Sequence, residues 1–184
     1  MPDLDAITTE VLWTRLISVV DEAALTLHRT SFSTVVRESH DYTCMLLDPN
    51  GRALAQATRS VPSFIGTLPN SVRAFLRKFP AETLSAGDFI ICNDPWLGTG
   101  HLPDLTAAMP IMRGVDLIGF AGVIAHLPDI GGRRRAPDNK DIYEEGLQIP
   151  IAKLYDDGKP NEVLMELIRR NVRVPDEVSG DIHA

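Results

Sequence analysis

The spacing of apolar residues along the chain predicts three helices. Apolar side chains recur every three or four residues over residues 8–30, 68–79 and 162–174, as one face of an amphipathic helix requires. The second helix ends before Pro80, and a further helix-like stretch begins at Pro175. Trp13 lies on the first helix and is expected in the core. The apolar face of that helix consists of Val11, Leu12, Leu16, Val19, Val20, Ala23, Ala24 and Leu27.

Shorter apolar runs predict strands. Residues 42–48 and 52–58 flank a turn that ends in Asn50 and Gly51, which is a strong hairpin signal. Residues 88–94 indicate a buried strand that stops at Pro95, and another strand is predicted over 116–125. Two loops rich in glycine and proline, 95–106 and 126–139, follow these last two strands. Helices and strands together predict a single α+β domain over residues 1–184, without repeats or linkers.

Charge and apolar content limit the function classes. The formal charge is −7, and no cluster of Lys and Arg is large enough to favour nucleic acid as a partner. The N-terminal residues carry acids where a secretory signal would carry positive charge, and no apolar run approaches the roughly 18 residues of a membrane span. We therefore expect a cytoplasmic protein that contacts no membrane. Cys44 and Cys92 lie within strand-like runs and are expected to be buried free thiols.

Ligand-type side chains gather where the strands meet the loops. His101 and Asp104 are separated by two residues in a loop restrained by proline, His126 follows a strand, and Asp41 precedes one. Two imidazoles and two carboxylates that converge from rigid supports form a site suited to Mn, Fe or Zn rather than a thiolate site. The alternative is that the Asp residues cap turns and the His side chains are simply solvated.

Other loop residues leave two interpretations open. Asp129 either orients a histidine ligand or caps a turn, and Asp94 is either a turn former or a site residue. Trp96 could wall a pocket. The run 133–135 of three arginines could clamp a phosphate or a carboxylate, or could be a solvated loop. No glycine-rich phosphate-binding motif occurs, so ATP is not expected on this chain.

Several segments carry a family resemblance. The stretches RTSFSTVVRESHDYTC, CNDPWLGTGHLPD, AHLPDIGG and YEEGLQIPIAKLY occur in an order that resembles the N-terminal part of the hydantoinase B and oxoprolinase family. The resemblance covers nearly the whole chain. It implies an amidohydrolase that works with an A-type partner subunit, on which ATP phosphorylates a lactam or cyclic imide. A divalent metal ion on the B-type protein then assists ring opening.

The resemblance also implies roles for particular residues. It places the metal ligands at Asp41, His101, Asp104 and His126, which are the residues that the spacing selects. Asn93, Asp94 and Thr99 correspond to the loop that frames the site and are expected to contact substrate. Glu145 falls near the substrate pocket, and together with His126 and Asp129 it is expected to act in catalysis.

Two alternatives and two departures from the family pattern accompany this expectation. Similar proteins are subunits of ATP-dependent ketone carboxylases, so carboxylation could replace hydrolysis. The first departure is Leu127, where the family usually has a second histidine. Family members are also several hundred residues long, so a chain of 184 residues is expected to be truncated at its C-terminus. It could then be a catalytically silent module that binds a partner.

Overall fold

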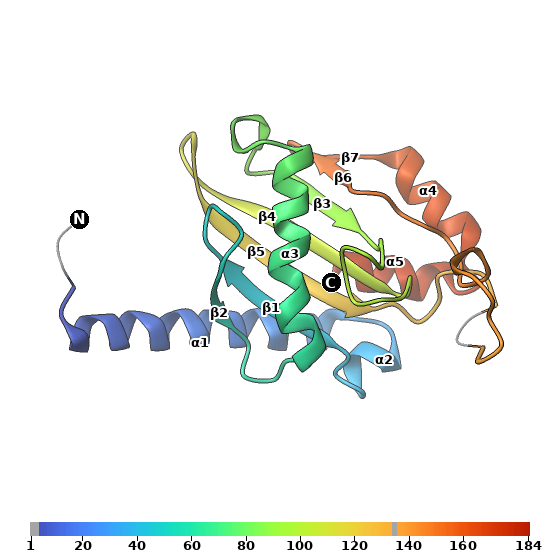
Figure 1. Ribbon diagram of the computed structural model, residues 1–184, viewed down its shortest axis with the longest axis horizontal. Coiled ribbons are helices and arrows are strands. Elements are labelled where there is room, and N and C mark those ends of the chain that lie inside the picture. The colour runs from blue at the N-terminus through green and yellow to red at the C-terminus, as the bar shows by residue number, and fades with distance from the viewer. Residues whose placement is uncertain (1–3, 134–135) are drawn as a thin grey trace.

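A single antiparallel sheet organises the chain. The computed structural model describes residues 4–133 and 136–184. In these residues seven strands pair in the order β2-β1-β5-β4-β3-β6-β7 (Figure 1). The strands are β1 (Tyr42–Leu47), β2 (Ala53–Gln56), β3 (Phe89–Cys92), β4 (Asp104–Arg113), β5 (Asp116–His126), β6 (Ala152–Asp156) and β7 (Lys159–Pro160). The helices are α1 (Ala6–Thr30), α2 (Thr34–Arg37), α3 (Pro62–Lys78), α4 (Glu162–Asn171) and α5 (Pro175–His183). The predicted α+β class is confirmed.

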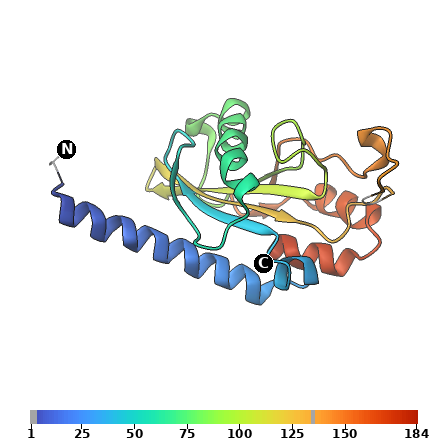
Figure 2. The same cartoon turned by 60° about the horizontal axis from the view of Figure 1, so that its bottom comes forward.

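Helices cover both faces of the sheet. Helix α3 lies on one face, and α1, α4 and α5 lie on the other (Figure 2). Each strand contributes side chains in alternation to the hydrophobic cores on the two sides of the sheet, because successive side chains of a strand point to opposite faces. In β3, for example, Ile90 and Cys92 face α3, whereas Ile91 joins the core beneath α4 and α5.

The predicted hairpin and helices are present, with shifted boundaries. Residues Asp48 to Gly51 form the turn between β1 and β2. Helix α3 begins six residues before the predicted start at Leu68, because Pro62 suits the first turn and the helix tolerates Pro69 in its interior. Helix α4 ends at Asn171 rather than at residue 174, and α5 forms from the stretch that begins at Pro175.

The first helix is the expected one, but five of the eight residues of its predicted apolar face are exposed. Asp5 caps its N-terminus by accepting a hydrogen bond from the backbone N–H of Thr8. Only Val20, Ala24 and Leu27 are buried, because the N-terminal half of the helix extends past the edge of the sheet (Figure 1). The prediction that Trp13 lies in the core is therefore wrong, since that residue is 54% exposed.

Strand β4 was not predicted. The expected loop 95–106 ends at Pro103, and Asp104 already begins the strand. Residues 104–108 are all buried, so the strand shows no alternation of polar and apolar positions, and Pro110 further disguises it. Strands β6 and β7 were also missed.

Two other expectations can be compared with the fold. Cys44 and Cys92 are buried free thiols, as predicted, and burial raises the pKa of Cys44 to about 12. Among the described residues, no helix combines the length and the apolar character needed to cross a membrane.

Candidate metal centre

Three neighbouring strands bring the predicted ligands into one row. Asp104 begins β4 and His126 ends β5, and the two residues are directly paired across the strands. Strand β1 lies on the other side of β5, where the backbone N–H of His126 donates to the carbonyl oxygen of Asp41 at 3.0 Å. His101 reaches the same place from the loop before β4. Sheet register therefore sets the relative positions of Asp41, His126 and Asp104.

The side chains converge on one carboxylate. Asp104 Oδ1 lies 2.8 Å from His101 Nε2 and 2.8 Å from His126 Nδ1. One ligand atom from each of these three residues lies within 4.8 Å of the others. Asp41 is more distant, with 3.9 Å between its Oδ2 and His126 Nδ1. The structure thus assembles three of the four predicted ligands closely and places the fourth beside them.

The buried carboxylate is held in its charged form. Burial by itself would raise the pKa of Asp104, but hydrogen bonds from His101, His126 and Thr99 together hold that pKa well below its usual range. The Thr99 hydroxyl donates to the second oxygen, Oδ2. The Asp104 side chain is 3% exposed, whereas those of His101 and His126 are 23% and 14% exposed. The site therefore has a fixed anionic base and imidazoles that open toward solvent.

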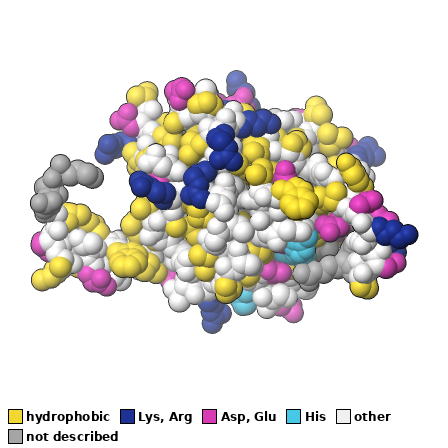
Figure 3. Space-filling view, in the orientation of Figure 1, with side chains coloured by type: hydrophobic (Ala, Val, Ile, Leu, Met, Phe, Trp, Pro, Cys, Tyr) yellow, Lys and Arg dark blue, Asp and Glu magenta, His cyan; other side chains and the backbone are white. Residues whose placement is uncertain are grey.

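These residues fit a divalent metal ion. Two imidazole nitrogens and an ionised carboxylate oxygen face one another, and this donor set suits Mn, Fe or Zn. Asp41, one third exposed, could add a second carboxylate. The partly exposed side chains of His101, His126 and Asp41 are accessible to a small molecule. Figure 3 shows histidine surface next to acidic side chains on one face of the molecule.

The second histidine loop is tied down by an ion pair. Both oxygens of Asp129 are engaged, since Oδ1 accepts from the backbone of Gly131 and from Arg173 Nη1, and Oδ2 accepts from the backbone of Arg173. Any part of Asp129 in catalysis, which stays a prediction, would require these bonds to break. Leu127, where the family usually has histidine, is buried in the core at 2% exposure. Sequence reasoning missed Arg173, because 44 residues separate it from Asp129 and no local pattern marks the pair.

The side chains that were predicted to contact substrate make hydrogen bonds within the protein. The Asn93 side chain donates to the carbonyl oxygens of Leu102 and Leu147 and accepts from the backbone of Ile149. Asp94 forms a turn by accepting from the backbone N–H of Trp96. Asn93 therefore holds the loop that carries His101, and contacts of Asn93, Asp94 and Thr99 with substrate stay predictions.

Glu145 also supports this loop. Its Oε2 accepts from the backbone N–H of Leu102 at 3.0 Å, directly after His101. Trp96, 90% exposed, and Glu145 both line a pocket of about 260 Å³. Trp96 as the wall of a pocket is thus in agreement with the structure.

The predicted arginine run is only partly described. Arg133 forms ion pairs with Asp138 and Glu144 across its own loop. Arg134 and Arg135 lie outside the described residues.

Known proteins share this sequence and fold. The model of the hydantoinase B/oxoprolinase family matches residues 5–184. The chain belongs to this family. It is 34% identical to the B-type component of a putative D-/L-hydantoinase of Pseudomonas sp. (strain NS671) and 33% identical to the beta chain of the caprolactamase of Pseudomonas jessenii. These matches cover 98% and 100% of this chain but 32% of each relative, so the chain spans about a third of their length.

Solved structures extend the family likeness to the fold. The ATP-dependent caprolactamase of Pseudomonas jessenii matches 98% of this chain and 31% of its own, with a TM-score of 0.84 and 31% identity. Acetone carboxylase matches 93% of this chain and 24% of its own, with a TM-score of 0.80 but only 20% identity, so that likeness concerns the fold alone. The resemblance inferred from the sequence motifs is confirmed.

Proposed function

We propose that this member of the hydantoinase B/oxoprolinase family supplies the metal centre of an ATP-dependent complex that opens a cyclic amide. The observation that carries the proposal is the convergence of His101, Asp104 and His126 within 4.8 Å at the end of the sheet. Relatives named as subunits of a hydantoinase and a caprolactamase support the substrate class. We further propose that an A-type partner protein holds ATP and activates the amide.

The chemistry is divided between the metal ion and the protein. A bound divalent ion supplies a Lewis acid that polarises the carbonyl group and assists attack by water. Hydrogen bonds from both imidazoles to Asp104 Oδ1 hold the three proposed ligands together, and an ion bound among them would replace the shared protons. Thr99 holds the carboxylate through its other oxygen. His101 is the more exposed of the two imidazoles. Activation by ATP has a physical reason, because an unstrained amide is a poor electrophile and phosphorylation of its oxygen withdraws electrons from the carbon that water attacks.

Ketone carboxylation is the weaker candidate. The similarity to acetone carboxylase is limited to the fold, whereas the similarity to caprolactamase extends to the sequence. A catalytically silent module that only binds a partner would need no metal ion, so metal content separates it from the proposed enzyme component.

The test is the metal content of the purified chain, measured by mass spectrometry. We expect about one Mn, Fe or Zn ion per chain, because the donor set suits these metals. Asp104→Ala should lose the ion, whereas Asp116→Ala, which removes an exposed carboxylate at the far end of the β4–β5 hairpin, should keep it. Absence of metal from the unaltered chain, or full metal content in Asp104→Ala, would contradict the proposal.

A further inference from the structure

The small pocket lined by Trp96 and Glu145 includes part of the loop that carries His101, one of the proposed metal ligands. Gly100, which lines the pocket, directly precedes His101, and Leu102, which is bound by the pocket residue Glu145, directly follows it. The pocket volume of about 260 Å³ is below that of most drug-sized sites and suits a compound with one small ring.

Hydrogen bonds orient two carboxylates of this pocket. Asp141 accepts a hydrogen bond from the backbone N–H of Tyr143 and so caps a short helical turn. Glu145 Oε2 accepts from Leu102, and this bond fixes the orientation of the carboxylate. Within the described parts of the chain, no group donates a hydrogen bond to Glu145 Oε1. Lys140 also lines the pocket and supplies a positive charge. The pocket therefore presents an oriented hydrogen-bond acceptor that has a free lone pair.

The walls of the pocket suit a flat ring. Trp96 lies on the metal-site loop and is 90% exposed, and Ile142 lies on the opposite segment. An exposed indole offers a large apolar face on which a planar ring can stack. A ring placed against Trp96 would have its polar edge available to Glu145.

We propose that this pocket binds the ring of the substrate and that Glu145 Oε1 accepts the hydrogen bond of a ring N–H. This inference rests on the proposed function and narrows it to secondary cyclic amides. A site built to bind an N–H group rejects analogues that lack it, because the acceptor is then left unpaired. Ketones and N-alkylated lactams should therefore bind poorly, and Glu145 is a specificity-determining residue.

Fluorescence of Trp96 provides the test. Trp13→Phe leaves Trp96 as the only tryptophan, and the zinc-loaded chain is titrated with 2-pyrrolidinone, N-methyl-2-pyrrolidinone and cyclopentanone. We expect 2-pyrrolidinone to change the fluorescence and to bind at least about tenfold more tightly than the other two compounds. Equal affinities for the three compounds, or no binding of any, would overturn the inference.

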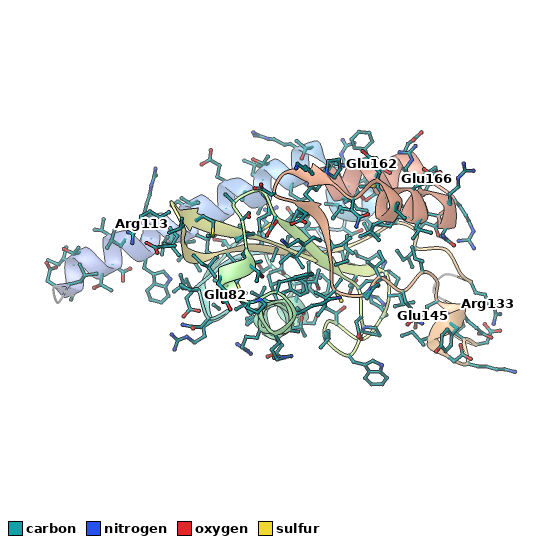
Figure 4. All side chains as sticks on the ribbon, turned by 90° about the horizontal axis from the view of Figure 1, so that it is seen from above. Glu82, Arg113, Arg133, Glu145, Glu162 and Glu166 are labelled. Atoms are coloured by element: carbon teal, nitrogen blue, oxygen red, sulfur yellow. The ribbon has the colours of Figure 1, made fainter. Side chains whose placement is uncertain are left out.

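Two further variants separate recognition from support of the loop. In Glu145→Gln the side-chain oxygen can still accept from Leu102, but the amide NH₂ then faces the ring N–H, so the preference for 2-pyrrolidinone should disappear. Glu166→Gln makes the same change on α4, away from Glu145 (Figure 4), and should retain the preference. An unchanged preference in Glu145→Gln would overturn the inference.

The zinc content of the same samples distinguishes failure of this inference from failure of the proposed function. If zinc binds but the preference for 2-pyrrolidinone is absent, only the role of Glu145 is wrong. If zinc does not bind, the proposed function itself is wrong.

Discussion

Buried carboxylates at three positions differ in their surroundings. Asp88 and Asp129 each pair with a permanently charged side chain, Lys153 and Arg173, and also accept backbone hydrogen bonds. Asp104 instead faces two imidazoles and a hydroxyl. Imidazoles bind metal ions in their neutral form. Asp104 therefore has the surroundings that the proposed metal site requires, whereas Asp88 and Asp129 stabilise the fold.

Replacement of Asp88 tests this structural role. Its side chain is fully buried and accepts from Ser85, Asp157 and Lys153. Asp88→Ala should lower the free energy of unfolding by about 3 kcal/mol, because one partner of a buried pair is lost. Urea denaturation measures the change. The control is Asp156→Ala, which removes the exposed partner of Lys153 and should cost less than about 1 kcal/mol. Equal costs would contradict the structural assignment.

The same pair predicts a dependence on pH. Burial opposes ionisation of Asp88, but hydrogen bonds from Lys153, Asp157 and Ser85 outweigh it and lower the pKa in the folded state. The stabilisation is then present above the ordinary Asp pKa of about 3.9 and is lost as pH falls through the folded value. Urea midpoints from pH 6 to pH 2 should fall more steeply for the unaltered chain than for Asp88→Ala. Parallel curves would show that Asp88 contributes nothing to acid unfolding.

At the scale of single residues, the sequence predicted which side chains gather at the end of the sheet, because each of them has a local signal. His101 is followed by Leu102 and Pro103 before Asp104 begins β4, Asp41 directly precedes β1, and His126 ends β5. The sequence could not reveal that Asp129 is engaged by Arg173, since that contact depends on how α5 approaches the loop.

One segment connects the two loops that carry the histidines. The backbone of Glu144 accepts from Arg133, and the backbone of Leu147 donates to Ile130 at 2.8 Å. On the other side, Glu145 and Leu147 accept hydrogen bonds from the backbone of Leu102 and the side chain of Asn93. Residues 144–149 thus brace both loops, and the spacing of the metal ligands depends on how closely this segment packs.

Gly146 allows that close packing. It has a φ of +142°, and a Cβ atom there would lie 2.2 Å from the carbonyl oxygen of Ile130. Gly146→Ala should force the segment away and weaken zinc binding about tenfold or more, as loss of groups that orient metal ligands does. Competition with a chromophoric chelator measures the affinity. Gly114→Ala is the control, since Gly114 also has a positive φ but a Cβ there meets open space. Unchanged zinc affinity in Gly146→Ala would contradict the bracing role.

At the scale of elements, sequence patterns succeeded where a turn or a regular apolar spacing marks the element. The hairpin, α1 and α5 have clear turn or periodic signals. Sequence patterns failed to predict β4, the strand that positions Asp104, because its first five residues are buried on both faces. The element most important to the site is therefore the one with the least readable pattern.

The whole molecule is asymmetric about its sheet. Helix α3 packs entirely on its face, with Leu68, Val72 and Phe75 fully buried. Helix α1 packs only through its C-terminal half, and its N-terminal half extends beyond the sheet with apolar side chains exposed (Figure 2). Helical periodicity indicated which residues share a face, but it could not show where the sheet beneath the helix ends.

Matched substitutions along α1 test this asymmetry. Leu27 is 9% exposed and Leu12 is 48% exposed on the same helix. Leu27→Ala should lower the free energy of unfolding by about 2–4 kcal/mol, because it leaves a cavity in the core. Leu12→Ala should cost less than about 1 kcal/mol, because little of its surface leaves water on folding. Urea denaturation at two protein concentrations measures both. A large, concentration-dependent cost for Leu12→Ala would show instead that the N-terminal half of α1 packs against a second molecule in solution.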